Sequence, residues 1–409
     1  TDTSPASQVL AISIYSLCPI YASRQFDVKS RVFLILTGVI FTLNPFILQN
    51  YSYIFDSISM SLAALMATLA FTSISKELES PSIKGYLNGI FLGAVFLFSS
   101  LSLYQAAFGI FMAFSATYSI VNLFHNRIHG NLSKIAFSYI TSASIALALY
   151  FPIKIIFVGR NYGLQKSRTP SLMETPKIIL ENFISLIDYL KLLLGTEVLG
   201  LLTMTYLAFI FFSLCLMTIK TILKIERSSF FQAKEFFHIS ILVMLYGFIL
   251  ASSIGGLNLL LLNPVWEPRV LMGFSALLCG SGFTLWKQIK QNEEFKIFTI
   301  VSTTVLAILF INISLTYGNV VSAQTFYNQT TAARLLIDLK TATTNELMSS
   351  EESKIFILGE MDDASPLVKV ARRKYPFMKE MLPSYFRHWF HSYQLLKSQG
   401  MEHKPTYLY

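Results

Sequence analysis

Apolar segments long enough to cross a membrane recur along this chain, and they limit its possible folds more than any other feature. A helix needs about 20 mostly apolar residues to span the hydrocarbon core of a bilayer. Only 13% of the 409 residues are charged, against about 25% in an ordinary soluble domain. The sequence therefore predicts an all-α polytopic membrane protein.

The apolar segments predict about ten transmembrane helices, followed by a tail of different composition. Residues 318–409 hold 20 of the chain's 55 charged residues. The tail combines helical periodicity with "KIFILG", a pattern typical of a short buried strand. We therefore predict a transmembrane domain, 1–317, and a small C-terminal α/β domain, 318–409. The predicted spans are 8–22, 32–49, 57–75, 85–102, 105–123, 135–158, 198–219, 237–261, 270–286 and 297–317.

Lysines and arginines gather in five loops that alternate along the chain, which predicts the orientation in the membrane. Cytoplasmic loops carry an excess of these residues. The intervening loops and the C-terminal domain are then predicted to lie on the opposite face. The net charge of +9 reflects this topology, so no nucleic-acid partner is predicted. One outer loop, 159–197, also holds cations and includes the amphipathic stretch 178–195, which suits a helix lying in the membrane interface.

A single acid, Asp56, stands in "FILQNYSYIFDSISMSL" between two apolar segments. One interpretation is a helix N-cap, since a carboxylate there accepts backbone N–H bonds and suits the helix dipole. The alternative is a functional acid that takes a proton from an attacking hydroxyl group. The two roles can coexist.

Other polar and aromatic residues are predicted on the same face as Asp56, and this favours a functional site. Taken singly, they fit ordinary roles in an aromatic belt, in snorkelling or in a local ion pair. Taken together, they suit a lipid that carries an anionic group, because Arg and Lys bind phosphate and aromatic rings can stack on a sugar. We predict Glu267 as a second catalytic acid and the following as substrate-binding residues: Tyr53, Tyr104, Gln105, Lys154, Arg160, Trp266 and Arg269.

Several other kinds of site have no support in the sequence. It contains no Walker loop and no HExxH, GxSxG or DxD motif. The three cysteines, Cys18, Cys215 and Cys279, each lie in an apolar segment without metal-ligand or disulfide spacing. We therefore predict neither a bound metal nor a cofactor.

Four segments carry a resemblance to a known family. In order, "TDTSPASQVLAI", "NPFILQNYSYIFDSISMSLAALMATLAF", "SLSLYQAAFGIF" and "EPRVLMGF" resemble parts of the serotype-converting, Gtr-type O-antigen glucosyltransferases. The likeness spans most of the chain, and the "NYSYIFDS" and "YQAAF" pieces are its most specific elements.

The resemblance implies a GT-C-like enzyme of the bacterial inner membrane. Such enzymes move glucose from a polyprenyl-phosphate carrier to lipid-linked O-antigen on the periplasmic side, with inversion at the anomeric carbon and without a firmly bound metal. It implies that Asp56, Tyr53, the Tyr104–Gln105 turn and Arg269 line the site. It also implies a base on the outer loop after the family's first span, which we expect to lie upstream of Thr1.

Two other functions remain open at this point. A transporter or flippase would move a lipid-linked sugar without chemistry, although such proteins more often contain matched pairs of broken helices. "ASSIGGLNLL" is a candidate break, but no counterpart is evident in the other half of the sequence. A polymerase or ligase would join whole O-antigen units.

Overall fold

The structure of the protein is a computed structural model. It describes residues 5–53, 55–78, 82–125, 129–157, 168–171, 173–195, 199–200, 203–204, 206, 208, 241, 244–289, 293–344, 365–382 and 395–400. The chain divides into two compact units, Thr1–Ser314 and Leu315–Tyr409.

The described part of the first unit is built from helices joined by short turns, in agreement with the predicted all-α membrane class. Three short 3₁₀ turns, η1 (Gln105–Ala107), η2 (Gly256–Leu260) and η3 (Pro268–Val270), interrupt or precede the longer helices. The α-helices are α1 (Ala6–Gln25), α2 (Arg31–Thr42), α3 (Pro45–Ser52), α4 (Ser57–Leu78), α5 (Ile83–Leu103), α6 (Phe108–His125), α7 (His129–Phe157), α9 (Thr175–Leu194), α12 (Met272–Ile289) and the first part of α13 (Glu293–Thr344).

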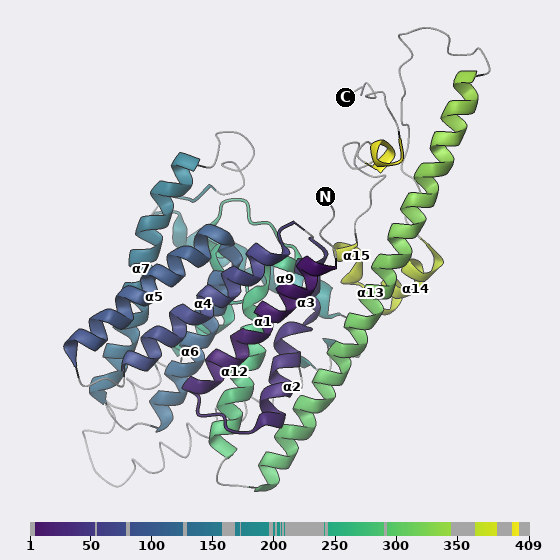
Figure 1. Ribbon diagram of the computed structural model, residues 1–409. Helices are drawn as coiled ribbons and strands as arrows, with labels where there is room; N and C mark the ends of the chain where they lie inside the picture. Colours follow the sequence, from purple (N-terminus) through teal and green to yellow (C-terminus); the bar gives the residue numbers. More distant parts are fainter. Residues whose placement is uncertain are drawn as a thin grey trace. The chain divides into compact units, whose positions relative to one another are not determined.

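The helices of this unit pack side by side, and aromatic rings fill the space between them. Helix α4 contacts α1 and α5, α5 contacts α7, and α6 contacts α12 (Figure 1). Phe26 is fully buried and its ring contacts Phe71, Tyr118 and Phe283, which come from three different helices. Aromatic pairs of this kind stabilise the core beyond the area that they bury.

The two ends of the bundle differ in charge. Helix connectivity puts the α1–α2, α4–α5 and α6–α7 connections at one end, where the described cations include Arg24, Lys29 and Lys84. The α3–α4 and α5–α6 connections lie at the other end with Asp56 and Tyr104. We call these the basic end and the site end of the bundle.

Fewer membrane spans are evident than the ten predicted. Among the described residues, five helices are long and apolar enough to cross a membrane, or six if a bent pair counts as one span. Most of the predicted span 198–219 lies outside the described residues. The last predicted span, 297–317, lies within α13, and this helix continues without a break to Thr344. The part of the tail with helical periodicity, from residue 326 on, belongs to this helix as far as Thr344.

The predicted span 32–49 is bent. Helices α2 and α3 meet at an angle of 61°, because Pro45 lacks the N–H that would continue α2. The side chain of Asn44 caps α3 by accepting the N–H of Phe46 at 2.9 Å. Asn-Pro is a favourable start for a helix, so these two residues account for the bend.

The predicted span 237–261 also ends early. Residues 244–252 are helical, but a turn and η2 follow. Gly256 has a φ of +53°, which glycine adopts without steric cost. The candidate break in "ASSIGGLNLL" is therefore confirmed, and it leads into the loop that carries Arg269.

Two glycines allow three backbone segments to meet near the site end. A Cβ at Gly273 would stand 1.8 Å from the carbonyl oxygen of Ser253, and a Cβ at Gly109 would stand 2.3 Å from the same atom. Small residues permit such close helix contacts in membrane proteins. We expect Gly273→Ala to destabilise the protein by about 1–3 kcal/mol, as overpacking does, which would appear as a lower Tm in detergent.

Gly247→Ala is the matched control for that substitution. Gly247 is also helical, but a Cβ there would meet nothing within 4 Å. The control should leave the Tm unchanged or raise it, since alanine favours helix by about 1 kcal/mol over glycine. Equal Tm values for the two variants would contradict the close packing at Gly273.

The second unit contains the rest of α13 together with α14 (Pro366–Lys374) and α15 (Met378–Met381). Its core includes Ala332, Leu336 and Leu396. The described residues of this unit are helical or lie in turns. "KIFILG", the predicted strand at 354–359, lies outside the described residues, so the α/β character of the tail stays a prediction.

Candidate functional site

Arg269 is the centre of the polar group at the site end. Its Nε lies 2.7 Å from Oε2 of Glu267. Its guanidinium also lies over the ring of Tyr53, with Cζ 4.4 Å from the ring centroid. The side chains of Arg269 and Glu267 keep 25% and 34% of their surface exposed. The pair is therefore sheltered but still open to a ligand.

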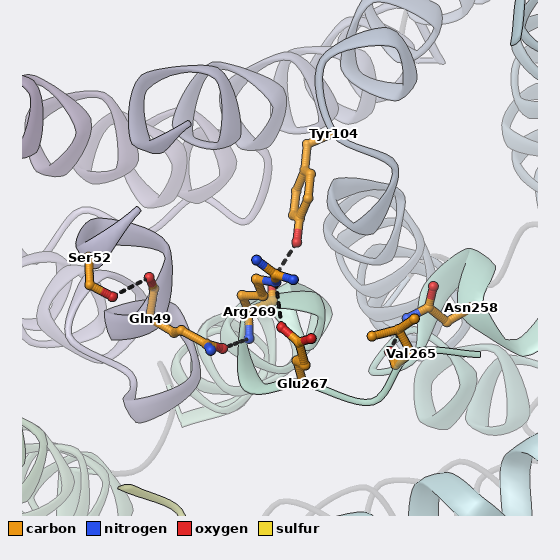
Figure 2. Close-up of polar contacts among 7 residues, drawn as sticks. All are labelled: Gln49, Ser52, Tyr104, Asn258, Val265, Glu267 and Arg269. Atoms are coloured by element: carbon orange, nitrogen blue, oxygen red, sulfur yellow. Dashed lines mark hydrogen bonds and ion pairs between the residues drawn. The ribbon is translucent and has the colours of Figure 1, made fainter. Parts of the chain in front are cut away.

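Side chains from separate elements fix the backbone that carries Arg269 (Figure 2). Gln49 of α3 accepts the Arg269 backbone N–H through Oε1 at 2.8 Å. The hydroxyl of Tyr104, at the end of α5, donates to the Arg269 carbonyl oxygen at 3.5 Å, which is long for a hydrogen bond. Asn258 of η2 donates to the carbonyl oxygen of Val265 at 3.0 Å. The loop from η2 to α12 is thus held at several points.

The charge of Asp56 contributes to the raised pKa of both Tyr53 and Tyr104. Burial raises the pKa of Tyr104, the positive charge of Arg269 opposes this rise, and the carboxylates of Glu267 and Asp56 add to it. The pKa of Tyr53 is raised by burial in the same way and responds to the same three charges. Both phenols therefore stay protonated at neutral pH, so that Tyr104 keeps the hydrogen that it donates.

Asp56 occupies the N-cap position of α4 and is exposed. Its carbonyl oxygen accepts the N–H of Met60 at 2.9 Å, the first hydrogen bond of the helix. The α3–α4 connection is short, so Asp56 stands three residues after Tyr53. The geometry is compatible with both predicted roles, because a carboxylate at a helix start is stabilised there and an exposed one can reach a substrate.

A second polar contact joins the α5–α6 turn to α7. Gln105 of η1 donates from Nε2 to the hydroxyl of Tyr150. Lys154 lies one helical turn further along α7, is 7% exposed, and has its Nζ 5.8 Å from the ring centroid of Phe151. Gln105 and Lys154 are therefore both at the site end, beside the turn that carries Tyr104.

Trp266 lies in the same loop as Glu267 and Arg269. Its indole nitrogen is buried, and it has no hydrogen-bond partner within the part of the chain that the structure describes. Arg160 lies outside the described residues, so its predicted place beside Arg269 is untested.

The residues that hold the Arg269 loop were not predicted from the sequence. Gln49 and Asn258 were not among the predicted site residues, and neither was Asn182, whose Nδ2 on α9 donates to the carbonyl oxygens of Leu259 and Leu261. Gln49 and Asn182 are 4% and 7% exposed. Burying an amide side chain in an apolar segment costs free energy unless the amide is hydrogen-bonded. The presence of these amides in apolar surroundings was the signal in the sequence that indicated them.

The described residues contain no group of three or more His, Cys, Asp or Glu side chains that could hold a metal ion. Cys18 and Cys279 are buried thiols. The described polar and aromatic residues at the site end include carboxylates, arginine, lysine, amides and aromatic rings.

Together these features define a multi-helix protein with membrane-length helices and a polar site at one end of the bundle. The family model described as Glucosyl transferase GtrII matches residues 1–280. The chain belongs to this family, so the predicted resemblance to Gtr-type glucosyltransferases is confirmed. No curated protein and no solved structure matches the chain. The family assigns glucosyl transfer, with a sugar donor and an acceptor, and favours this reaction over transport without chemistry.

Proposed function

We propose that the protein transfers glucose from a polyprenyl-phosphate carrier to lipid-linked O-antigen at the periplasmic face of the bacterial inner membrane. Membership of the GtrII family supports glucosyl transfer. The lipid-phosphate donor and the face of the membrane are proposed from one observation. Arg269 is a sheltered arginine at the end of the bundle opposite the basic end. The positive-inside rule makes the basic end cytoplasmic, and the site end is then periplasmic.

Arg269 is the proposed ligand of the donor phosphate. A guanidinium has five N–H donors, and the ion pair with Glu267 engages the one on Nε. The group can therefore bind a phosphate oxygen while it stays paired. Tyr53, beneath the guanidinium, limits its motion. A fixed cation stabilises the negative charge that develops on a leaving phosphate, and such preorganisation is often the largest contribution to catalysis.

Asp56 is the proposed base. An acceptor hydroxyl oxygen attacks the anomeric carbon, a new C–O bond forms, and the bond from that carbon to the phosphate oxygen breaks. The phosphate leaves with the electron pair, and the hydroxyl proton passes to the Asp56 carboxylate. One displacement of this kind inverts the anomeric configuration. The exposed position of Asp56 at the start of α4 leaves it accessible to a hydroxyl group.

Glu267 has a different proposed role from the one predicted from the sequence. Its carboxylate oxygen Oε2 lies 2.7 Å from Nε of Arg269, so the carboxylate is engaged by the guanidinium. We assign it to orienting the guanidinium. Trp266 and Tyr53 are the proposed rings for stacking on the sugar, whereas Gln105 and Lys154 remain proposed ligands for polar or anionic parts of the lipid substrates.

The test is transfer of glucose by the purified protein in membranes that contain polyprenyl-phosphate glucose and the lipid-linked acceptor. Mass analysis of the acceptor glycan should show an increase of one hexose. An unchanged glycan with movement of lipid-linked sugar would support the transporter instead. A ladder of long products would support a polymerase or ligase, and either result would overturn the proposal.

A further inference from the structure

Gln49 stands apart from the residues that the proposed chemistry uses, yet it makes one of the shortest contacts to them. It lies in the last turn of α3 and is 4% exposed. Its Oε1 accepts the backbone N–H of Arg269 at 2.8 Å, across 220 positions in the sequence (Figure 2). We infer that Gln49 is a positioning residue that sets the Arg269 guanidinium for the donor phosphate. The inference rests on the proposed function.

The Arg269 N–H needs a partner from outside its own helical turn. The first N–H groups of a helix or helical turn have no acceptor within it, and Arg269 is the second residue of η3. The two N–H groups that follow, those of Val270 and Leu271, bond to the carbonyl oxygens of Glu267 and Pro268. Pro268 itself has no N–H. Gln49 therefore satisfies the first donor of the turn, at the residue that carries the cation.

Helix α3 is a rigid support for this contact. The residue after Gln49, Asn50, donates from Nδ2 to the hydroxyl of Tyr15 at 3.1 Å. The next, Tyr51, donates its hydroxyl hydrogen to the carbonyl oxygen of Thr42 at 2.9 Å. All three side chains of this turn are buried. The turn that carries Gln49 is thus tied to α1 and to the end of α2.

The contact acts on the guanidinium through the backbone. The bond from Tyr104 to the Arg269 carbonyl oxygen is long, at 3.5 Å, so the 2.8 Å contact of Gln49 to the N–H is the stronger of these two restraints. The guanidinium must lie over Tyr53 and against Glu267 at the same time. A displacement of about 1 Å at a substrate-positioning group can lower the rate about 100-fold. Loss of the Gln49 hydrogen bond should therefore lower kcat/KM for the donor.

The test compares Gln49→Met with Gln49→Glu in full-length protein reconstituted in membranes. Methionine keeps the size of the side chain but offers no comparable acceptor, whereas glutamate keeps the acceptor oxygen. We expect Gln49→Met to raise the donor KM and to lower kcat/KM for the donor about 10- to 100-fold, with the acceptor KM unchanged. Gln49→Glu should remain within about threefold of the wild type.

Two further variants separate positioning from stability. Gln324→Met is the matched control, because Gln324 is also buried, at 3% exposed, but lies in the second unit. It should leave the donor KM unchanged. In the Arg269→Ala background the guanidinium is gone, so adding Gln49→Met should change binding of polyprenyl phosphate by less than about twofold.

The outcomes distinguish this inference from the proposed function. If the wild-type protein transfers no glucose, the proposed function fails and the role of Gln49 falls with it. If the wild type is active and Arg269→Ala is impaired, but Gln49→Met keeps the wild-type donor KM, only the inference about Gln49 fails. It also fails if Gln49→Met weakens polyprenyl-phosphate binding equally with and without Arg269.

Discussion

Arg269→Ala is expected to lower kcat/KM for the polyprenyl-phosphate sugar about 100- to 1000-fold, as removal of a fixed donor to a developing oxyanion does. The substitution should lower kcat and raise the donor KM, because the phosphate is negatively charged in the bound donor and gains further negative charge as it leaves. The acceptor KM should change little. Steady-state transfer kinetics with each substrate varied in turn measure all three quantities.

Three variants control this prediction. Arg24→Ala removes an arginine whose Cζ also lies over a tyrosine ring, 5.2 Å from the centroid of Tyr21, but at the basic end. It should keep wild-type kinetics. Arg269→Lys should recover part of the activity, since lysine supplies a point charge without the planar fork. Glu267→Gln combined with Arg269→Ala removes the carboxylate that would otherwise be left unpaired. Wild-type rates in Arg269→Ala would remove Arg269 from the site.

Asp56→Asn is expected to lower kcat about 100-fold or more, as loss of a general base does, while the KM values stay near those of the wild type. Asparagine is nearly the same size and is also a good N-cap residue. The substitution therefore keeps the start of α4 and removes the proton acceptor. Single-turnover transfer at saturating substrate measures the loss directly.

Asp27→Asn is the matched control for that substitution. Asp27 is exposed and pairs with Lys29 at 3.7 Å, at the basic end. Its φ of +55° lies in the left-handed region, which asparagine tolerates well. The control should retain full activity and stability. A fully active Asp56→Asn would leave Asp56 as a helix cap alone and would assign the proton to another base.

Local sequence rules predicted the helices because those rules depend on neighbours in the chain. The segments 8–22, 57–75 and 85–102 became α1, α4 and α5 with boundaries shifted by a few residues. The amphipathic stretch 178–195 became α9. An apolar segment in a membrane must satisfy its own backbone polar groups, so composition and length were sufficient for these elements.

The breaks between helices were harder to predict, although their causes are local. Asn44 and Pro45 bend the predicted span 32–49, but hydropathy averaged over a span does not detect this bend. The end of the helix before Gly256 was noted only as a candidate break. Helix α13 runs through the predicted domain boundary at residues 317 and 318 and ends at Thr344. Hydropathy averages over many residues, whereas a break depends on one or two.

The sequence alone determined the membrane class, the family and the chemical types of the site residues, because these follow from composition and from short motifs. It did not determine which of those residues meet. Arg269 takes its place from Glu267 two residues away, but also from Tyr53 and Gln49, more than 200 positions earlier. Only packing of α3 against η3 brings these side chains together, and the tertiary structure alone specifies that packing.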